Sequence, residues 1–187
     1  MRIIYYVEAF VVAVLSLIIY IPFLNKEKVY IIKEDFRAWS IWKKYKYSIF
    51  SFFLCFIEYK QFRNVVYYRL GKSSYLLSWL FKGMTNLYIY SPSIGGGFTI
   101  QHGFSTIINA NKIGCNFKVF QQVTIGYNGS ENPSIGDNVT VCCGAKVIGG
   151  VHIGNNVTIG ANAVVVKDIP DNVIVAGVPA KVIKYLK

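Results

Sequence analysis

An aliphatic residue returns every six positions through the C-terminal half of the chain. The first series is Ile94, Ile100, Ile107, Ile113, Val119 and Ile125, with one additional residue between its second and third members. The second series is Ile135, Val141, Val147, Ile153, Ile159 and Val165. A period of six does not match helical periodicity, whereas a short strand followed by a turn produces it. This repeat is the signature of a parallel β-helix, a solenoid whose short strands point their aliphatic residues inward.

Composition divides the chain into two parts. Before Ser91 lie 24 of the 30 aromatic residues and 13 of the 20 basic residues, and from Ser91 onward lie 14 of the 16 glycines. We expect a hydrophobic N-terminal segment at residues 1–32, a helical, aromatic and basic region at residues 33–90, and the β-helix domain at residues 91–187. The predicted fold class is therefore mainly β, with an α-helical region before the solenoid.

The segment Ile3–Leu24 is 22 residues long, carries the single charge of Glu8, and is long enough to cross a bilayer as a helix. Far more basic residues follow this segment than precede it, which predicts that the following domain faces the cytoplasm. We therefore expect a location at the cytoplasmic face of the inner membrane. The alternatives are a cleaved signal peptide, or a buried or surface-lying helix that ends at Pro22 in a cytoplasmic protein.

Basic and aromatic residues alternate before the solenoid. The basic ones are Lys60, Arg63, Arg69, Lys72 and Lys82, and the aromatic ones are Tyr59, Phe62, Tyr67, Tyr68, Tyr75 and Trp79. This mixture fits attachment to an anionic membrane face, and it equally fits an aromatic helical core with a solvated basic rim. A nucleic-acid partner is not expected despite the net charge of +11, because no nucleic-acid-binding motif accompanies the charge.

Cysteine and histidine are sparse. The four cysteines form no C-x-x-C pair, which favours a reduced, cytosol-facing protein. With His102 and His152 as the two histidines, a zinc site would need an unusual ligand set, so we expect no metal.

Three segments carry a resemblance to a known family: IGGGFTIQHGF (Ile94–Phe104), the run from Ile135 to Asn172, and AGVPAKVI (Ala176–Ile183). They resemble the hexapeptide-repeat acyltransferases, in particular the serine acetyltransferase branch. The resemblance implies a left-handed parallel β-helix, acetyl-CoA as co-substrate, and a homotrimer with active sites between subunits, in which two trimers can pair.

His102 stands where this family places its catalytic histidine. Acetyl transfer to a hydroxyl needs a base, and a histidine serves that role near neutral pH. The resemblance therefore implies that His102 deprotonates the acceptor and later protonates the leaving thiolate. The alternative is a polar side chain at a solenoid turn.

The resemblance also implies a place for the co-substrate. Cys143 and Ala161, which are 18 residues apart, match the small residues that flank the pantetheine arm. Lys167 and Lys181 match basic positions near the nucleotide phosphates, where lysine acts as a point charge. The alternative is that Ala161 is a turn residue and that both lysines are solvated.

The acceptor side departs from the family pattern. Serine acetyltransferases have an aspartate at the position of Gln101, and no acidic residue occurs between Glu58 and Glu131 in this chain. The loop from Gly126 to Ser134 also lacks the Arg and His that the serine enzymes use. Gln101, Asn128 and Ser130, together with Asn132, fit a neutral acceptor such as a sugar, although a plain exposed turn would explain the loop as well.

These observations predict an acetyl-CoA-dependent O-acetyltransferase that acts on a sugar hydroxyl in cell-surface polysaccharide synthesis, with a saccharide, free or lipid-linked, as its acceptor. One alternative is a serine O-acetyltransferase of cysteine biosynthesis. A second is a non-catalytic trimeric scaffold, which the retained His102 argues against.

Overall fold

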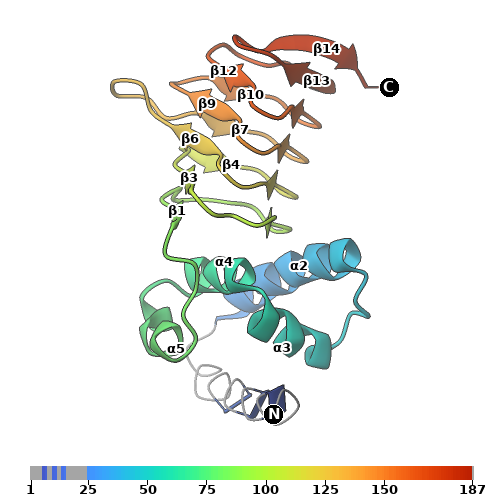
Figure 1. Ribbon diagram of the computed structural model, residues 1–187, viewed down its shortest axis with the longest axis vertical. Helices are drawn as coiled ribbons and strands as arrows, with labels where there is room; N and C mark the ends of the chain where they lie inside the picture. The colour runs from blue at the N-terminus through green and yellow to red at the C-terminus, as the bar shows by residue number, and fades with distance from the viewer. Residues whose placement is uncertain (1–5, 8–9, 12–13, 16–24, 187) are drawn as a thin grey trace. The chain divides into compact units, whose positions relative to one another are not determined.

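The computed structural model describes residues 6–186 except 8–9, 12–13 and 16–24. The chain forms two compact units, Met1–Met84 and Thr85–Lys187 (Figure 1). The second unit thus begins six residues before residue 91, where we placed the start of the β-helix domain.

The first unit is helical, which confirms the predicted helical region. It contains α2 (Lys26–Lys43), α3 (Ile49–Glu58), α4 (Lys60–Leu70), the 3-10 helix η2 (Gly71–Ser74) and α5 (Tyr75–Leu80). Side chains cap two of the helix starts, because Asn25 accepts a hydrogen bond from the Lys28 N–H and Ser48 accepts one from the Ser51 N–H.

Aromatic side chains form the core of the helical unit. Trp39, Phe56 and Phe62 are completely buried, and the rings of Trp39 and Phe62 meet edge to face at 5.1 Å between centroids. A buried ion pair joins α2 to α4, where Arg69 Nε lies 2.8 Å from Asp35 Oδ2.

Two of the basic residues in the alternating stretch are buried rather than solvated or membrane-facing. Besides Arg69, this is true of Arg63, whose Nη1 donates to the carbonyl oxygens of Phe56 and Ile57, both at 3.0 Å. Those carbonyls belong to the last turn of α3, where helical partners are missing and a cation is favoured. Arg63 and Arg69 therefore serve the helical core.

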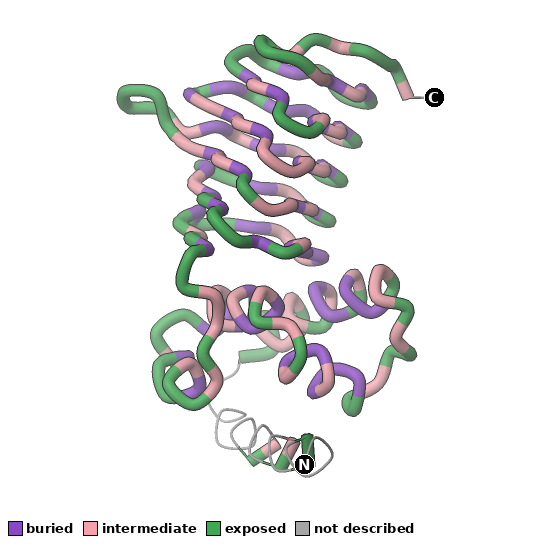
Figure 2. The backbone as a smooth tube through the Cα atoms, viewed as in Figure 1, coloured by how far each residue is buried: buried purple, intermediate pink, exposed green. Residues whose placement is uncertain are grey.

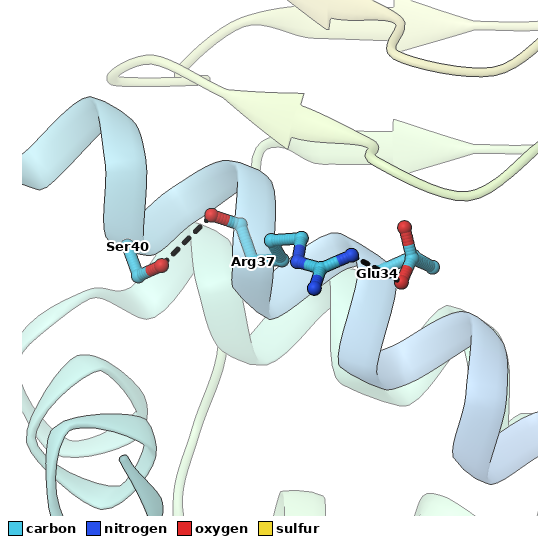
Figure 3. A network of polar contacts seen from close by, with 3 residues as sticks. All are labelled: Glu34, Arg37 and Ser40. Carbon is cyan, nitrogen blue, oxygen red and sulfur yellow. Dashed lines mark hydrogen bonds and ion pairs between the residues drawn. The ribbon is translucent and has the colours of Figure 1, made fainter. Parts of the chain in front are cut away.

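A local network of polar contacts runs along α2 (Figure 3). Arg37 Nη1 lies 3.5 Å from Glu34 Oε1, and Ser40 Oγ donates to the Arg37 carbonyl at 2.8 Å. An exposed pair of this kind contributes little to stability.

No helix in the described part of the chain is long and apolar enough to cross a membrane. The span that we predicted at Ile3–Leu24 lies mostly outside the described residues.

The second unit is a parallel β-solenoid of three sheets. The first sheet holds β1 (Leu87–Ile89), β3 (Thr106–Ile108), β6 (Thr124–Gly126), β9 (Lys146–Ile148) and β12 (Val164–Val165). The second holds β4 (Lys112–Ile113), β7 (Ser134–Ile135) and β10 (His152–Ile153). The third holds β2 (Thr99–Ile100), β5 (Lys118–Val119), β8 (Thr140–Val141), β11 (Thr158–Ile159) and β13 (Val173–Ala176), followed by the antiparallel β14 (Lys181–Tyr185). The chain visits the sheets in that order in every coil, which confirms the predicted β-solenoid, while its left-handed winding stays a prediction.

The aliphatic column is buried as the six-residue repeat predicts, with one exception. All six members of the second series are buried, as Figure 2 illustrates for the solenoid as a whole. In the first series, however, Ile107 is 39% exposed and its neighbour Ile108 is completely buried. Ile108 pairs with the inward-facing Ile125, so the predicted place of Ile107 in the column was wrong. The turn before β3 is longer than the sequence spacing suggested, and this shifts the inward position by one residue.

Asparagines stack at the turns between the second and third sheets. Asn116, Asn138, Asn156 and Asn172 all have φ between 55° and 58°, a left-handed conformation that asparagine tolerates. Each side-chain amide donates to the next along the stack, at 2.9, 2.9 and 2.8 Å. The stack holds four successive turns in register, and we call it the asparagine ladder.

Candidate active site

His102 lies on an enlarged turn between the third and first sheets. These turns comprise residues 101–105, 120–122, 142–144 and 160–162, and we call them together the histidine corner. In three coils, two residues separate the inward aliphatic residue from the left-handed residue of the turn: Val119 from Gln122, Val141 from Gly144, and Ile159 from Asn162. In the first coil, four residues separate Ile100 from Ser105. The two additional residues make room for His102 to project from the corner.

The backbone at His102 is strained. His102 has φ of 61°, and the Gly103 N–H donates to the Gln101 carbonyl at 2.7 Å, which closes a three-residue turn around the histidine. Turns of this kind with a positive φ at the central residue are rare and cost free energy. The imidazole itself is exposed. Strain of this kind is concentrated at functional sites, so the turn supports a functional role for His102.

The side-chain neighbour of His102 is an amide. Gln101 Nε2 lies 3.5 Å from His102 Nε2, and the direction of donation depends on the imidazole tautomer. Within the described residues, no carboxylate forms a hydrogen bond with this histidine. Gln101 is thus in place to contact either the imidazole or a group bound to it.

Cys143 and Ala161 lie on the same corner, in successive coils. The Asn162 N–H donates to the Cys143 carbonyl at 2.9 Å, which stacks the turn of Ala161 on the turn of Cys143. Strands of neighbouring coils are about 4.8 Å apart, so the two side chains line one narrow track. Ala161 is exposed and Cys143 half-buried. The structure thus brings the two residues that we matched to the pantetheine arm onto the corner that carries His102.

The two candidate lysines lie on different corners. Lys181 is exposed in β14 and pairs with Ala176, whose strand runs into the histidine corner one coil beyond Ala161. Lys167 is also exposed, but it follows β12 and belongs to the turns between the first and second sheets, which we call the loop corner. Within one chain, therefore, Lys181 lies on the corner of His102 and Lys167 does not.

The predicted acceptor loop also belongs to the loop corner. Residues 127–133 connect β6 to β7, and a bridge between Asn128 and Glu131 closes the loop around Ser130. A Cβ atom at Gly150 would lie 2.2 Å from Glu131 Oε2, so glycine there lets the loop fold onto the next coil. Asn128 and Ser130 are exposed, and within one chain the structure does not bring them to Gln101.

Gln121 is a site residue that we did not predict from the sequence. It occupies, in the second coil, the turn position that Cys143 and Ala161 occupy in later coils. Its Oε1 is buried without a hydrogen-bond partner, which is costly for an amide oxygen. Counting two residues beyond the inward Val119 would have found it, because the same step leads from Val141 to Cys143.

The thiol of Cys142, the residue before Cys143, is poorly suited to act as a nucleophile. Burial is the main cause that raises its pKa above the ordinary value, with a smaller contribution from Cys143, so the thiol stays protonated near neutral pH. Among the described residues, no three His, Cys, Asp or Glu side chains gather as a metal site. His152 is exposed in β10, away from the histidine corner.

Known proteins match the chain over its solenoid and beyond. Residues 132–167 match the family described as bacterial transferase hexapeptide (six repeats). A serine acetyltransferase of Staphylococcus epidermidis is 34% identical over 134 residues, covering 68% of this chain and 61% of the relative. A serine acetyltransferase of Staphylococcus aureus is 42% identical over 96 residues, covering 49% of this chain and 45% of the relative. The chain thus spans between about half and three fifths of the length of these curated relatives.

Solved structures show the same fold. The serine acetyltransferase from Brucella abortus strain S19 aligns with a TM-score of 0.68 at 25% identity, over 87% of this chain and 71% of that one. The serine acetyltransferase of Neisseria gonorrhoeae aligns with a TM-score of 0.69 at 25% identity, over 87% of this chain and 67% of that one.

Proposed function

We propose that this hexapeptide-repeat protein, which is similar to serine acetyltransferases, transfers an acetyl group from acetyl-CoA to a hydroxyl group. The observation that carries the proposal is the exposed, strained His102 on a corner whose following coils present Cys143 and Ala161 in a track. The similarity to serine acetyltransferases over 68% of the chain supports the same chemistry.

His102 acts as the general base in this reaction. A neutral imidazole accepts the hydroxyl proton while the hydroxyl oxygen attacks the thioester carbonyl carbon. The carbon–sulfur bond then breaks, and the imidazolium returns the proton to the departing thiolate. The exposure of His102 leaves room for both reactants, and its strained turn fixes the direction in which the imidazole points.

The histidine corner supports a path for acetyl-CoA along the solenoid. The small side chains of Cys143 and Ala161 leave space beside the backbone for the narrow pantetheine arm. Lys181, farther along the same corner, would meet the phosphates as a point charge. Gln121 lies between His102 and Cys143, where rotation of its half-buried side chain would let the unpaired oxygen accept a hydrogen bond from an amide N–H of that arm.

A homotrimer would complete the site. Lys167, Asn128 and Ser130 lie on the loop corner, whereas His102 and Gln101 lie on the histidine corner of the same chain. A ring in which the loop corner of one subunit faces the histidine corner of the next would bring the two sets together. We therefore place the site at the boundary between subunits.

Free serine is the acceptor that the relatives favour. The relatives described above are serine acetyltransferases, which supports serine over the sugar that the sequence led us to expect. The amide oxygen of Gln101 can accept a hydrogen bond from the ammonium group of serine. A sugar hydroxyl stays the second candidate, because Gln101 and the loop from Gly126 to Ser134 offer amides and hydroxyls instead of charges.

Thiol release from acetyl-CoA separates the candidates. Purified full-length protein should release thiol with free serine, and a panel of sugars and lipid-linked saccharides tests the second candidate in parallel. Turnover with saccharides alone would overturn the assignment to serine. If the protein binds acetyl-CoA but releases thiol with none of these acceptors, the assignment as a transferase is wrong.

A further inference from the structure

One face of α5 is apolar and open to solvent. Tyr75, Leu76, Trp79 and Leu80 are all exposed, and their spacing places them on a single helix face, which we call the α5 patch. Trp79 is 73% exposed, whereas Leu77 on the opposite face is completely buried.

The α5 patch contrasts with the aromatic core of the helical unit, where Trp39 and Phe62 are fully buried. Single exposed apolar residues are ordinary, but a contiguous set that includes two aromatic rings marks an interaction surface. Leu77 is the one fully buried side chain within α5, so more of the helix's side chains face outward than pack into the core.

Positive charge surrounds the α5 patch. Lys72 precedes α5 and Lys82 follows it, and both are exposed. The described helical segment, residues 25–84, has 12 Lys and Arg against 4 Asp and Glu, a net charge of +8. None of those acidic residues lies between residues 59 and 84.

We propose that the α5 patch docks into the interface of an anionic lipid bilayer. Trp79 and Tyr75 are amphipathic rings that favour the headgroup level, and Leu76 and Leu80 extend toward the acyl chains. Lys72 and Lys82 then meet lipid phosphates, and each contributes about a fivefold gain in membrane partitioning. This inference goes beyond acetyl transfer, because it says where the enzyme works rather than what it does.

A second copy of the chain fits the α5 patch less well. Two such patches in contact would bring together two units that each carry a net charge of +8. Like charges that face each other across an interface oppose association. An anionic surface offers both the apolar layer and the opposite charge.

Quenching of Trp79 by brominated lipid tests the proposal. Full-length protein is mixed with vesicles whose phosphatidylglycerol is brominated on the acyl chains, and tryptophan emission is recorded. We expect strong quenching in the native protein and a large loss of quenching in W79F. The matched control W42F should keep the quenching, because Trp42 lies in α2 outside the α5 patch. Because bromine quenches only at short range, this readout reports lipid contact at Trp79 itself.

A separate comparison tests the contribution of positive charge to membrane binding. Vesicles of brominated phosphatidylcholine alone, or the double variant K72Q/K82Q on the anionic vesicles, should quench several-fold less. Equal quenching on neutral and anionic vesicles would overturn the role of the lysines. Absence of Trp79 quenching on anionic vesicles, or protection of Trp79 by self-association in solution, would overturn the proposal.

Acetyl transfer separates a failure of this inference from a failure of the proposed function. W79F and K72Q/K82Q should retain native turnover in detergent, because α5 does not belong to the solenoid unit that carries His102. Normal turnover without Trp79 quenching would overturn the membrane surface and leave the enzyme assignment standing.

Discussion

Arg69 holds the buried carboxylate of Asp35 with two hydrogen bonds, from Nε to Oδ2 at 2.8 Å and from Nη2 to Oδ1 at 3.1 Å. The pair joins α2 to α4 across 34 positions of sequence. Removing one partner of a buried pair leaves the other charge buried with neither a counter-charge nor water. This costs more folding free energy than the loss of an exposed contact.

Replacing Asp35 by Ala should therefore lower the unfolding free energy of the helical unit by about 3 to 5 kcal/mol. Tryptophan fluorescence during urea unfolding measures this unit alone, because all three tryptophans precede Ser91. The neighbouring exposed pair is the control, and Glu34→Ala should change the unfolding free energy by less than about 1 kcal/mol. Equal effects of the two variants would show that the Arg69 pair is not buried in solution.

Replacing His102 by Ala should reduce kcat by about 100- to 10,000-fold, because the acceptor hydroxyl loses its base. Binding of acetyl-CoA should persist, since the variant leaves Cys143, Ala161 and Lys181 in place. His152→Ala is the matched control and should keep native turnover, as His152 is exposed in β10. Native turnover in the His102 variant would show that His102 is not the general base.

Replacing Gln121 by Met should stabilise the solenoid while impairing binding. The substitution removes a buried oxygen without a partner, and the unfolding free energy should rise by about 1 kcal/mol. The KM for acetyl-CoA should rise as well if the amide contacts the pantetheine arm. Thermal unfolding followed by circular dichroism and steady-state kinetics measure the two effects. A variant with higher stability and an unchanged KM would show that Gln121 does not contact this substrate.

Replacing Asn138 by Ala should break the asparagine ladder at an inner position. Two side-chain hydrogen bonds are lost, and alanine must adopt φ of 57°, so we expect a loss of about 2 to 4 kcal/mol. Asn138→Gly separates the two causes, because glycine adopts this φ freely but restores no hydrogen bond. Equal stabilities of the Ala and Gly variants would assign the whole loss to the hydrogen bonds.

Alkaline pH should destabilise the helical unit through Cys55. Burial raises the pKa of its thiol to about 12, while an unfolded cysteine ionises near about 8.5. The stabilisation is complete below the lower value and is lost as pH rises toward the upper one, because only the unfolded state releases its proton. Urea unfolding at neutral pH and at about pH 10 should therefore show a smaller loss in Cys55→Ala than in the native protein. An identical loss in both proteins would assign the alkaline effect to other groups.

Thiol labelling offers an independent check on the same residue. Cys115 is exposed and should react with an aromatic disulfide reagent in the folded protein, whereas Cys55 should react only after unfolding.

The solenoid could be predicted from the sequence because its repeat is local. Each inward position, such as Val147 or Ile159, is set within its own coil and recurs every six residues. The six-residue step predicted Ile107 wrongly, because the turn that carries His102 is two residues longer than its counterparts. The types of residue in that turn do not reveal its length.

The candidate site was only partly predictable for a different reason. His102, Cys143 and Ala161 fall on one corner because the repeat places them there. Which corner Lys167 and Asn128 occupy depends on counting coils across the irregular loop after β6. The role of Arg63 was missed because a carbonyl partner cannot be seen in a pattern of charges.

The antiparallel direction of β14 changes which backbone edge the third sheet presents beyond β13. A solenoid that ended in another parallel strand would offer an open template to any further chain, and such open ends allow fibrils to grow. Here the last strand runs backwards, and it presents the exposed Lys181 and Lys184 to any chain that approaches. These charges oppose the addition of a further strand along the edge of β14.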